Sequence, residues 1–271
     1  MKKNTLILCC FFALFCSAYA IKPVREYAVT PEMYGLTSET KHLQTADLFN
    51  IIAWHIFPAS EEKKDISIII SSSDAGNMGN WLEIAGYLAL SGFDIWLYDY
   101  RGFGESSDFP IDDNMLYYEE FVKDLAIVVE TVKNANPQNK ICLLGYSLGT
   151  LINMKYLIGN QHDVDFCIGD GHVYSPNIVA ERLNENSDKV FTLPQTNAPD
   201  FNWHNFYENF PIPMMLFHGS EDIVCADEDV KLLKTQVENL TIIPYTGKHL
   251  WSYMILQNDY IQHIESFLLK K

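Results

Sequence analysis

The sequence has little positive charge. Its 271 residues hold 19 Lys and Arg against 35 Asp and Glu, which gives a formal net charge of −16. A balance this acidic argues against nucleic acid and anionic membrane surfaces as partners and, more weakly, against polyanionic substrates. With 48% apolar and 20% charged residues, the chain otherwise has the composition of an ordinary globular protein.

Long apolar runs are scarce as well. One covers residues 6–15, preceded by Lys2 and Lys3 and followed by Ala18-Tyr19-Ala20. This order is typical of a secretory signal peptide, and the run is too short to span a bilayer as an anchor. A lipoprotein attached through Cys16 is disfavoured by the bulky Phe15. We predict a signal peptide over 1–20, cleavage after Ala20, no stable membrane insertion afterwards, and a secreted or periplasmic protein.

Cysteines are few and their number is odd once the signal is gone. Three of the six leave with it, and Cys142, Cys167 and Cys225 remain. An odd number excludes a closed disulfide framework. Cys142 and Cys167 lie in apolar, strand-like runs, which favours buried free thiols, although a 142–167 bridge is conceivable in an oxidising compartment. No Cys/His cluster indicates a metal, and we predict no cofactor.

Strand and helix patterns alternate through most of the chain. Residues 40–59 predict an antiparallel hairpin that turns at Thr45-Ala46-Asp47. Strands at 66–70, 93–99, 140–145, 164–170, 214–219 and 241–245 then alternate with helical patterns, among them 79–92, 117–136 and 251–270. We therefore predict one α/β domain over 21–271, with a mostly parallel, doubly wound sheet and helices on both faces. Residues 176–210 carry no clean strand and predict a short inserted lid.

The sequence "LLGYSLGT" (143–150) contains the motif G-x-S-x-G between a strand and a helical pattern. In this context the motif predicts a sharp turn that exposes the Ser147 hydroxyl, and small neighbours let strand and helix approach closely. The helix N-terminus below the turn favours a developing oxyanion. The sequence thus indicates that Ser147 is a nucleophile.

A serine nucleophile needs a base and an acid, and in this architecture they follow it in the order acid, then histidine. Asp222 comes just after strand 214–219, and His249 comes just after strand 241–245. Both are predicted at the same sheet edge as Ser147. Glu221 and Asp170 are rival acids at this edge. His172 lies near it too, and we predict it to be a pocket-wall residue.

With these motifs the chain resembles the α/β hydrolases, and within them the monoacylglycerol-lipase-like and serine-aminopeptidase-like branch. The resemblance runs over nearly all of residues 30–268, through "TPEMYGL", "WLEIAGYLALSGFDIWLYDYRGFGESS", "LLGYSLGT", "FHGSEDIV" and "TGKHL". It implies Ser147 as nucleophile, Asp222 as acid, His249 as base and the Leu148 N–H as an oxyanion donor. It also implies that Arg101 is a structural ion-pair partner.

The stretch "IIISSSDAGNMGNW" (68–81) departs from the family pattern. It lacks the glycine-rich motifs that cradle phosphate. The family usually has His-Gly after the third strand, whereas this chain has Ser72-Ser73, with Asp74 at the position of the second oxyanion donor. The donor is a main-chain N–H, so the change of side chain need not abolish it. An ionised Asp74 would oppose the oxyanion, so we expect its carboxylate to turn away, as in an Asx-turn.

These observations favour a serine hydrolase that cleaves carboxylic esters, with a small-molecule ester or acyl substrate. Five aromatics in "FNWHNFYENF" (201–210) could form a wall for an acyl chain or pack the lid onto the body. One alternative is a serine aminopeptidase that binds the amine through Glu185, Asp188 or Glu208. Another is a hydrolase-fold binding protein without activity. The sequence carries no signal for an oligomeric state.

Overall fold

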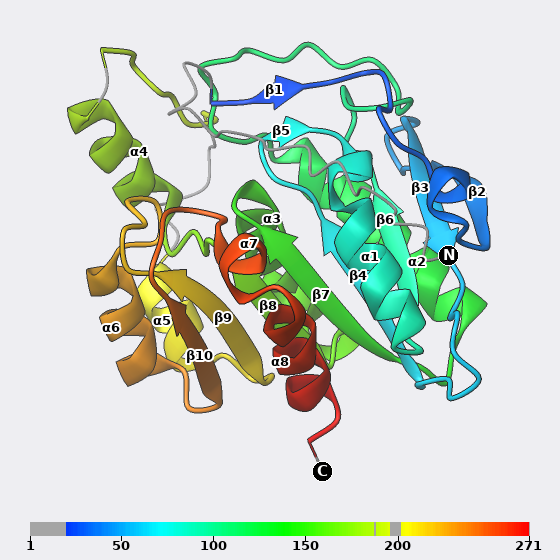
Figure 1. The fold of residues 1–271 in the computed structure, drawn as a ribbon. Helices are drawn as coiled ribbons and strands as arrows, with labels where there is room; N and C mark the ends of the chain where they lie inside the picture. The colour runs from blue at the N-terminus through cyan, green and yellow to red at the C-terminus, as the bar shows by residue number, and fades with distance from the viewer. Residues whose placement is uncertain (1–19, 187, 196–201, 271) are drawn as a thin grey trace, which may run out of the picture.

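The computed structural model describes residues 20–186, 188–195 and 202–270. Its centre is an eight-stranded sheet with the order β10-β9-β8-β7-β4-β6-β3-β2 (Figure 1). Along the chain, these strands are β2 (Ser38–Gln44), β3 (Asn50–Ile56), β4 (Ile66–Ser71), β6 (Asp94–Tyr98), β7 (Lys140–Tyr146), β8 (Phe166–Asp170), β9 (Met214–Gly219) and β10 (Leu240–Tyr245).

Strand directions in this sheet match the mainly parallel class. β3 runs antiparallel to both of its neighbours, β2 and β6. Every other neighbouring pair is parallel, from β10 with β9 through to β4 with β6. The predicted hairpin and the predicted mostly parallel α/β sheet are both confirmed.

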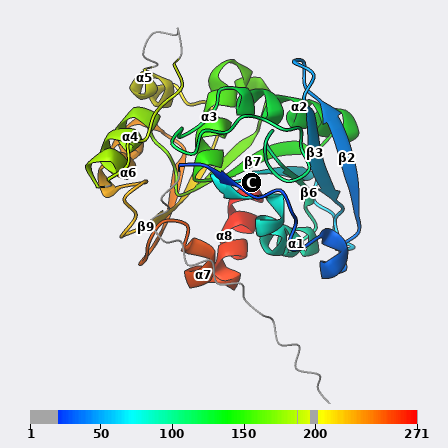
Figure 2. The same ribbon diagram turned by 90° about the horizontal axis from the view of Figure 1, so that it is seen from above.

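Helices cover the two faces of the sheet. On one face lie α1 (Leu82–Leu90) and α8 (Asn258–Leu268); on the other lie α2 (Glu120–Ala135), α3 (Leu148–Asn160) and α6 (Asp227–Gln236) (Figures 1 and 2). Each face has its own apolar core, because successive strand residues point to opposite sides. In β7, Leu143 belongs to one core and Leu144 to the other.

The two cores, one on each face of the sheet, also decide whether Cys142 and Cys167 can form a disulfide. Cys142, Cys167 and Cys225 are buried free thiols. Cys142 packs in the core beneath α1 and α8, whereas Cys167 packs in the core on the opposite face. Two side chains separated by the sheet cannot meet the narrow distance limits of a disulfide. The conceivable 142–167 bridge is therefore excluded.

Several smaller elements surround this frame. The predicted 251–270 helix is broken into α7 (Ser252–Leu256) and α8, because Gln257 between them has φ of 50°. The 176–210 segment contains α4 (Pro176–Glu185) and α5 (Trp203–Glu208). A second sheet of two short strands, β1 (Lys22–Pro23) and β5 (Ala75–Gly76), was not predicted. Single turns of 3₁₀-helix occupy Pro31–Tyr34, Met78–Trp81 and Gln161–Asp163.

The predicted signal peptide lies outside the described residues, except for Ala20. Among the helices that the structure does describe, none combines the length and the apolar character that crossing a bilayer would require.

Arg101 joins the loop after β6 to two other parts of the fold. Its guanidinium is fully buried and makes ion pairs with Asp47 at 3.0 Å and with Asp124 of α2 at 2.7 Å. Asp47 also pairs at 3.0 Å with Lys123, whose side chain is 54% exposed. This buried cluster holds the β2–β3 hairpin, the loop and α2 together, so Arg101 is the structural ion-pair partner that the resemblance implied.

Removing one member of a buried pair leaves an uncompensated charge, whereas an exposed pair contributes little. We expect Asp124→Ala to lower the free energy of unfolding by about 3–5 kcal/mol. Lys123→Ala, which removes an exposed partner of the same cluster, should cost less than about 1 kcal/mol. Urea unfolding followed by tryptophan fluorescence measures both, and equal losses in the two variants would contradict the assignment.

Candidate active site

Ser147 occupies a strained turn between β7 and α3. Its φ of 49° and ψ of −111° are a conformation that residues other than glycine rarely adopt. The glycines on either side permit the tight packing around it. A methyl group on Gly145 would lie 2.7 Å from Thr150 N, and one on Gly149 would lie 2.7 Å from the Ser71 carbonyl carbon. The turn thereby holds the Ser147 hydroxyl at the carboxyl edge of the sheet.

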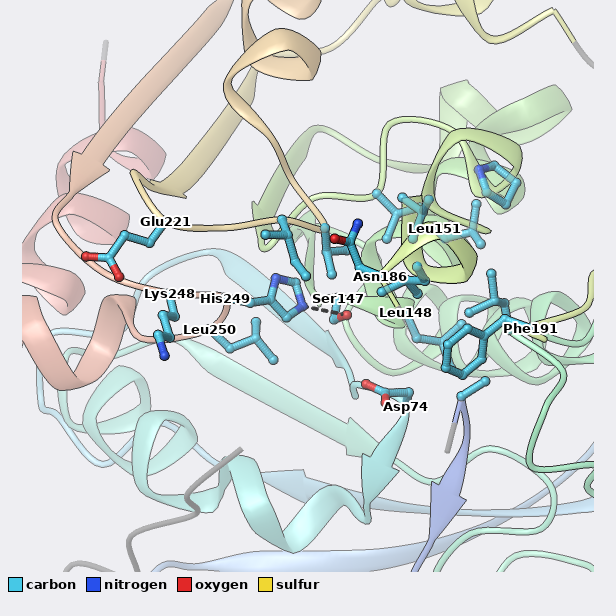
Figure 3. Close-up of a pocket in the computed structure, with 18 of the residues that line it drawn as sticks. Asp74, Ser147, Leu148, Leu151, Asn186, Phe191, Glu221, Lys248, His249 and Leu250 are labelled. Atoms are coloured by element: carbon cyan, nitrogen blue, oxygen red, sulfur yellow. Dashed lines mark hydrogen bonds between the residues drawn. The ribbon is translucent and has the colours of Figure 1, made fainter. Parts of the chain in front are cut away.

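The structure brings Ser147, His249 and Asp222 together, although 102 residues separate the first two. His249 Nε2 lies 2.8 Å from Ser147 Oγ, the contact drawn as a dashed line in Figure 3. His249 Nδ1 lies 2.8 Å from Asp222 Oδ2. The other carboxylate oxygen, Oδ1, accepts the main-chain N–H groups of Val224 and Cys225 at 2.8 and 2.9 Å. Asp222 is thus held in place, with one oxygen left for the imidazole.

The pKa values of this pair are coupled. Burial alone would lower the pKa of His249, but the charge of Asp222 and its hydrogen bond outweigh burial, and the pKa is raised. Burial alone would raise the pKa of Asp222, yet the imidazole and the two main-chain donors hold it below its ordinary value. The carboxylate therefore stays ionised and favours protonation of the imidazole, as a general base requires.

The rival acids lie elsewhere. The Glu221 side chain is exposed and lines the pocket mouth, with its main-chain N–H bonded to Gly247 O at 2.9 Å. Asp170 is buried, and its Oδ2 accepts the hydroxyls of Ser252 and, at 3.3 Å, Tyr260. Burial raises the pKa of Asp170 to about 7. Its main-chain oxygen instead accepts the Ser147 N–H at 2.9 Å, which supports the strained turn.

His172 is not the pocket-wall residue that the sequence predicted. It is fully buried, and its Nε2 lies 2.9 Å from the Tyr207 hydroxyl. Burial lowers the pKa of His172 to about 3, so the ring is neutral. The His172 side chain points into the core rather than into the cavity, and the hydrophobic periodicity of the sequence does not distinguish these two directions.

Asp74 lies where the second oxyanion donor was expected, beside Ser147 and Leu148 (Figure 3). The Leu148 N–H, at the first turn of α3, has no acceptor within the helix. The expectation that the Asp74 carboxylate turns away is wrong, because this side chain lies on the pocket side of the loop (Figure 3). Burial raises its pKa, and the hydrogen bond from its own main-chain N–H and the nearby His249 partly offset that rise.

The pocket at Ser147 has a volume of about 410 Å³. Its wall is mostly apolar and comes from α3, α4 and the loops around them: Leu116, Leu148, Leu151, Val173, Pro176, Val179, Leu183, Phe191 and Val224. The polar lining side chains are Asp74, Ser147 and His249 at the reaction centre and the exposed Asn186, Glu221 and Lys248 (Figure 3). Such a cavity fits an apolar group held next to the serine.

The lid aromatics do not form this wall. Trp203, Phe206 and Tyr207 of α5 are buried and pack against one another and the body, and Phe201 lies outside the described residues. Of the two readings of this stretch, packing is the one that the described residues support. The predicted amine ligands Glu185, Asp188 and Glu208 do not line the cavity either.

Two residues at the site were missed by the sequence reasoning. Ala20, two residues before β1, lines the cavity, because β1 docks beside β5 and carries the chain before it to the pocket. Gly171 packs against the His249 ring, and a methyl group there would lie 2.7 Å from Nδ1. A glycine after a strand end was a weak signal for Gly171; nothing in the sequence pattern indicated Ala20.

The chain is similar in sequence to a hydrolase family model and to several bacterial proteins. A family model described as serine aminopeptidase, S33, matches residues 63–191, just under half of the chain. The uncharacterised protein YfhR of Escherichia coli K12 is 25% identical over 277 residues, which cover 95% of this chain and 93% of YfhR. The probable lysophospholipase L2 of Haemophilus influenzae is 28% identical over 112 residues, or 41% of this chain and 36% of that protein.

Among solved structures, the Pyrococcus furiosus esterase Pf2001 superposes with a TM-score of 0.73 at 16% identity, covering 92% of this chain and 98% of the esterase. At this level of identity the similarity shows the fold.

A substitution at Gly171 tests whether this residue fixes the position of the His249 imidazole. The added methyl group of Gly171→Ala would displace the imidazole, and a misplacement of about 1 Å costs roughly 100-fold in turnover. Gly35→Ala is the matched control, since Gly35 has φ of 66° against 63° for Gly171 but no neighbour within 4 Å of the added methyl. Gly35→Ala measures the cost of an alanine at positive φ alone, and only Gly171→Ala should lose activity against p-nitrophenyl esters. Equal activities would contradict the assignment.

Proposed function

We propose that this chain, which has the α/β-hydrolase fold, is an exported serine hydrolase of carboxylic esters. The observation that carries the proposal is the pair of 2.8 Å contacts joining Ser147 Oγ to His249 and His249 to Asp222. This is the geometry in which a base can take the proton of a serine hydroxyl while a carboxylate keeps the imidazole oriented.

The reaction has two halves. Ser147 Oγ attacks the ester carbonyl carbon as its proton passes to His249 Nε2, and the carbonyl electrons move onto oxygen. The Leu148 N–H and the main chain at Asp74 are the proposed donors to that oxyanion. When the C–O bond to the alcohol breaks, the alcohol takes the proton from His249. Water, deprotonated by the same imidazole, then cleaves the acyl-enzyme and restores Ser147.

The cavity supports an acyl group as the part of the substrate that is recognised. Its apolar wall, made by α3 and α4 residues such as Leu151 and Val179, can bury a hydrocarbon chain next to the nucleophile. The polar mouth at Glu221 and Lys248 leaves room for a more hydrophilic alcohol. Export is supported by the signal-like sequence that ends at Ala20.

A serine aminopeptidase is the second candidate, favoured by the description of the matching family model. A substrate ammonium would have Asp74 and Glu221 as its carboxylate partners, since both line the cavity. The same catalytic groups would serve, so the substrate decides between the two activities.

The ester hydrolase is tested with p-nitrophenyl esters of increasing chain length beside aminoacyl p-nitroanilides. Ser147→Ala and His249→Ala should each lower ester turnover by roughly 10³-fold or more, while circular dichroism stays unchanged. Ser220→Ala, an exposed serine after β9, is the control and should leave turnover unchanged.

A fluorophosphonate should label the native chain and fail to label Ser147→Ala. Preference for the p-nitroanilides would establish the peptidase instead. Absence of labelling in folded protein would indicate a binding protein without activity.

The pH dependence follows from the pKa of His249. The base works only when neutral, and its pKa is raised above the ordinary value of about 6.5, chiefly by Asp222 opposing the effect of burial. We expect kcat/KM to fall as pH is lowered through that raised pKa. In Asp222→Asn the midpoint should move to lower pH, together with a large drop in the plateau. A midpoint that stays in place would show that Asp222 does not act on the base.

A further inference from the structure

Asp74 is an acidic group at a position where negative charge is harmful. Its carboxylate lies in the pocket beside Ser147 and Leu148, where the oxyanion of the proposed reaction forms (Figure 3). In the part of the chain that the structure describes, it makes no ion pair and no hydrogen bond with another residue's side chain or main chain. An ionised carboxylate beside a developing oxyanion opposes it, because like charges repel more strongly in a partly buried site than in water.

The start of the described chain lies directly beside Asp74. β1 pairs in parallel with β5, with Lys22 opposite Ala75 and Pro23 opposite Gly76. Lys22 N donates to Asp74 O at 2.8 Å. One step back in this register, Ile21 lies next to Asp74, and Ala20 lines the cavity together with Asp74.

Ile21 is firmly anchored at this place. Its side chain is 1% exposed and belongs to the apolar core on the α2 and α3 face. The β1–β5 pairing and this buried side chain hold Ile21 next to Asp74 whether or not Ala20 precedes it. An amino group created at the Ile21 nitrogen would therefore stay in the neighbourhood of Asp74.

We propose that cleavage after Ala20 makes the α-ammonium of Ile21 the counter-ion of Asp74, so that the loop can stabilise the oxyanion only in the processed chain. This inference rests on the proposed export and the proposed ester hydrolysis. Ile21 is a positioning residue in this scheme, because its ammonium acts on the reaction through Asp74.

The cleavage itself is an ordinary peptide hydrolysis by a signal-processing protease. Water adds across the Ala20–Ile21 bond, which leaves a carboxylate on Ala20 and an amino group on Ile21 that takes up a proton. Ala20 is 7% and Ile21 1% exposed in the folded chain, so this bond must be cut before β1 docks on β5. Removal of Ala20 also frees Asp113 O, which accepts the Ala20 N–H at 2.6 Å, as a second acceptor for the ammonium.

The new ion pair would be pH-dependent. The charged groups around Asp74 are His249, after β10, Lys22, whose main-chain N–H binds Asp74 O, and the more distant Glu221 and Lys248 at the pocket mouth. An α-amino group has an ordinary pKa of about 8, and a neighbouring carboxylate raises it. The ammonium is present below that raised pKa and is lost as pH rises through it, after which Asp74 opposes the oxyanion again.

The experiment compares two forms of the chain. One begins at Ile21, released from a fusion by a protease that leaves no extra residue, and the other keeps Gly-Ser before Ala20-Ile21. We expect the Ile21 form to have a kcat/KM for p-nitrophenyl butyrate at least about tenfold higher at pH 7.5. That advantage should disappear as pH rises through the pKa of the α-amino group. In Asp74→Asn the two forms should be equally active, and equal activity in the native background would overturn the proposal.

A second measurement does not depend on activity. The Ile21 amine is methylated with ¹³C-formaldehyde under reducing conditions, and its pKa is followed by NMR titration. We expect this pKa to be lower in Asp74→Asn than in the unsubstituted chain, and equal values would overturn the ion pair. Fluorophosphonate labelling of both forms separates the proposed function from the proposed ion pair. A lack of labelling in both forms refutes the serine hydrolase, whereas equal labelling rates in the two forms refute only the role of Ile21.

Discussion

The close approach of α3 to the end of β4 is the constraint on which the site depends. A methyl group on Gly149 would lie 2.7 Å from the Ser71 carbonyl carbon and 2.8 Å from Ser72 O, so no side chain fits between the helix and the strand. This contact brings the N-terminus of α3, and with it the Leu148 N–H, against the loop that carries Asp74. The strained Ser147 conformation results from the same packing, since the chain must turn sharply from β7 into a helix that is held this close.

The other groups reach this point because parallel strands end at one edge. Asp170 ends β8, and Asp222 and His249 follow β9 and β10; these three strands are successive neighbours in the sheet. Asp170 O fixes the Ser147 N–H, and the Asp170 carboxylate receives the Ser252 hydroxyl at the start of α7, three residues after His249. Gly171 leaves the space that the imidazole fills. The loops at this edge thus support one another as well as the nucleophile.

The sequence predicted the parts of this arrangement that depend on local pattern and chain order. G-x-S-x-G with a strand before it and a helix after it marked Ser147, and two strand ends marked Asp222 and His249. It could not predict what depends on docking between distant segments. Lys22 pairs with Ala75 through strands of two residues, which are too short to show a hydrophobic periodicity. The sequence therefore did not predict that Ala20 lines the pocket. The sequence also could not decide whether the α5 aromatics and His172 lie in the core or in the pocket wall, because both environments favour apolar and aromatic side chains.

Three carboxylates surround one imidazole, and the structure treats each of them differently. Asp222 is ionised and held by His249 and two main-chain donors. Asp170 is removed from water among hydroxyls, and burial raises its pKa to about 7, so much of its charge is absent near neutral pH. Asp74 alone has neither a paired cation nor a set of donors from other residues in the described part of the chain. Burial raises its pKa too, but protonating it by acidification would also protonate His249, whose own pKa is raised, and a protonated base cannot accept the serine proton. Neutralising Asp74 at a pH where His249 is free therefore requires a cation, and Ile21, the residue beside Asp74 in the β1–β5 register, is the one whose nitrogen signal cleavage would charge.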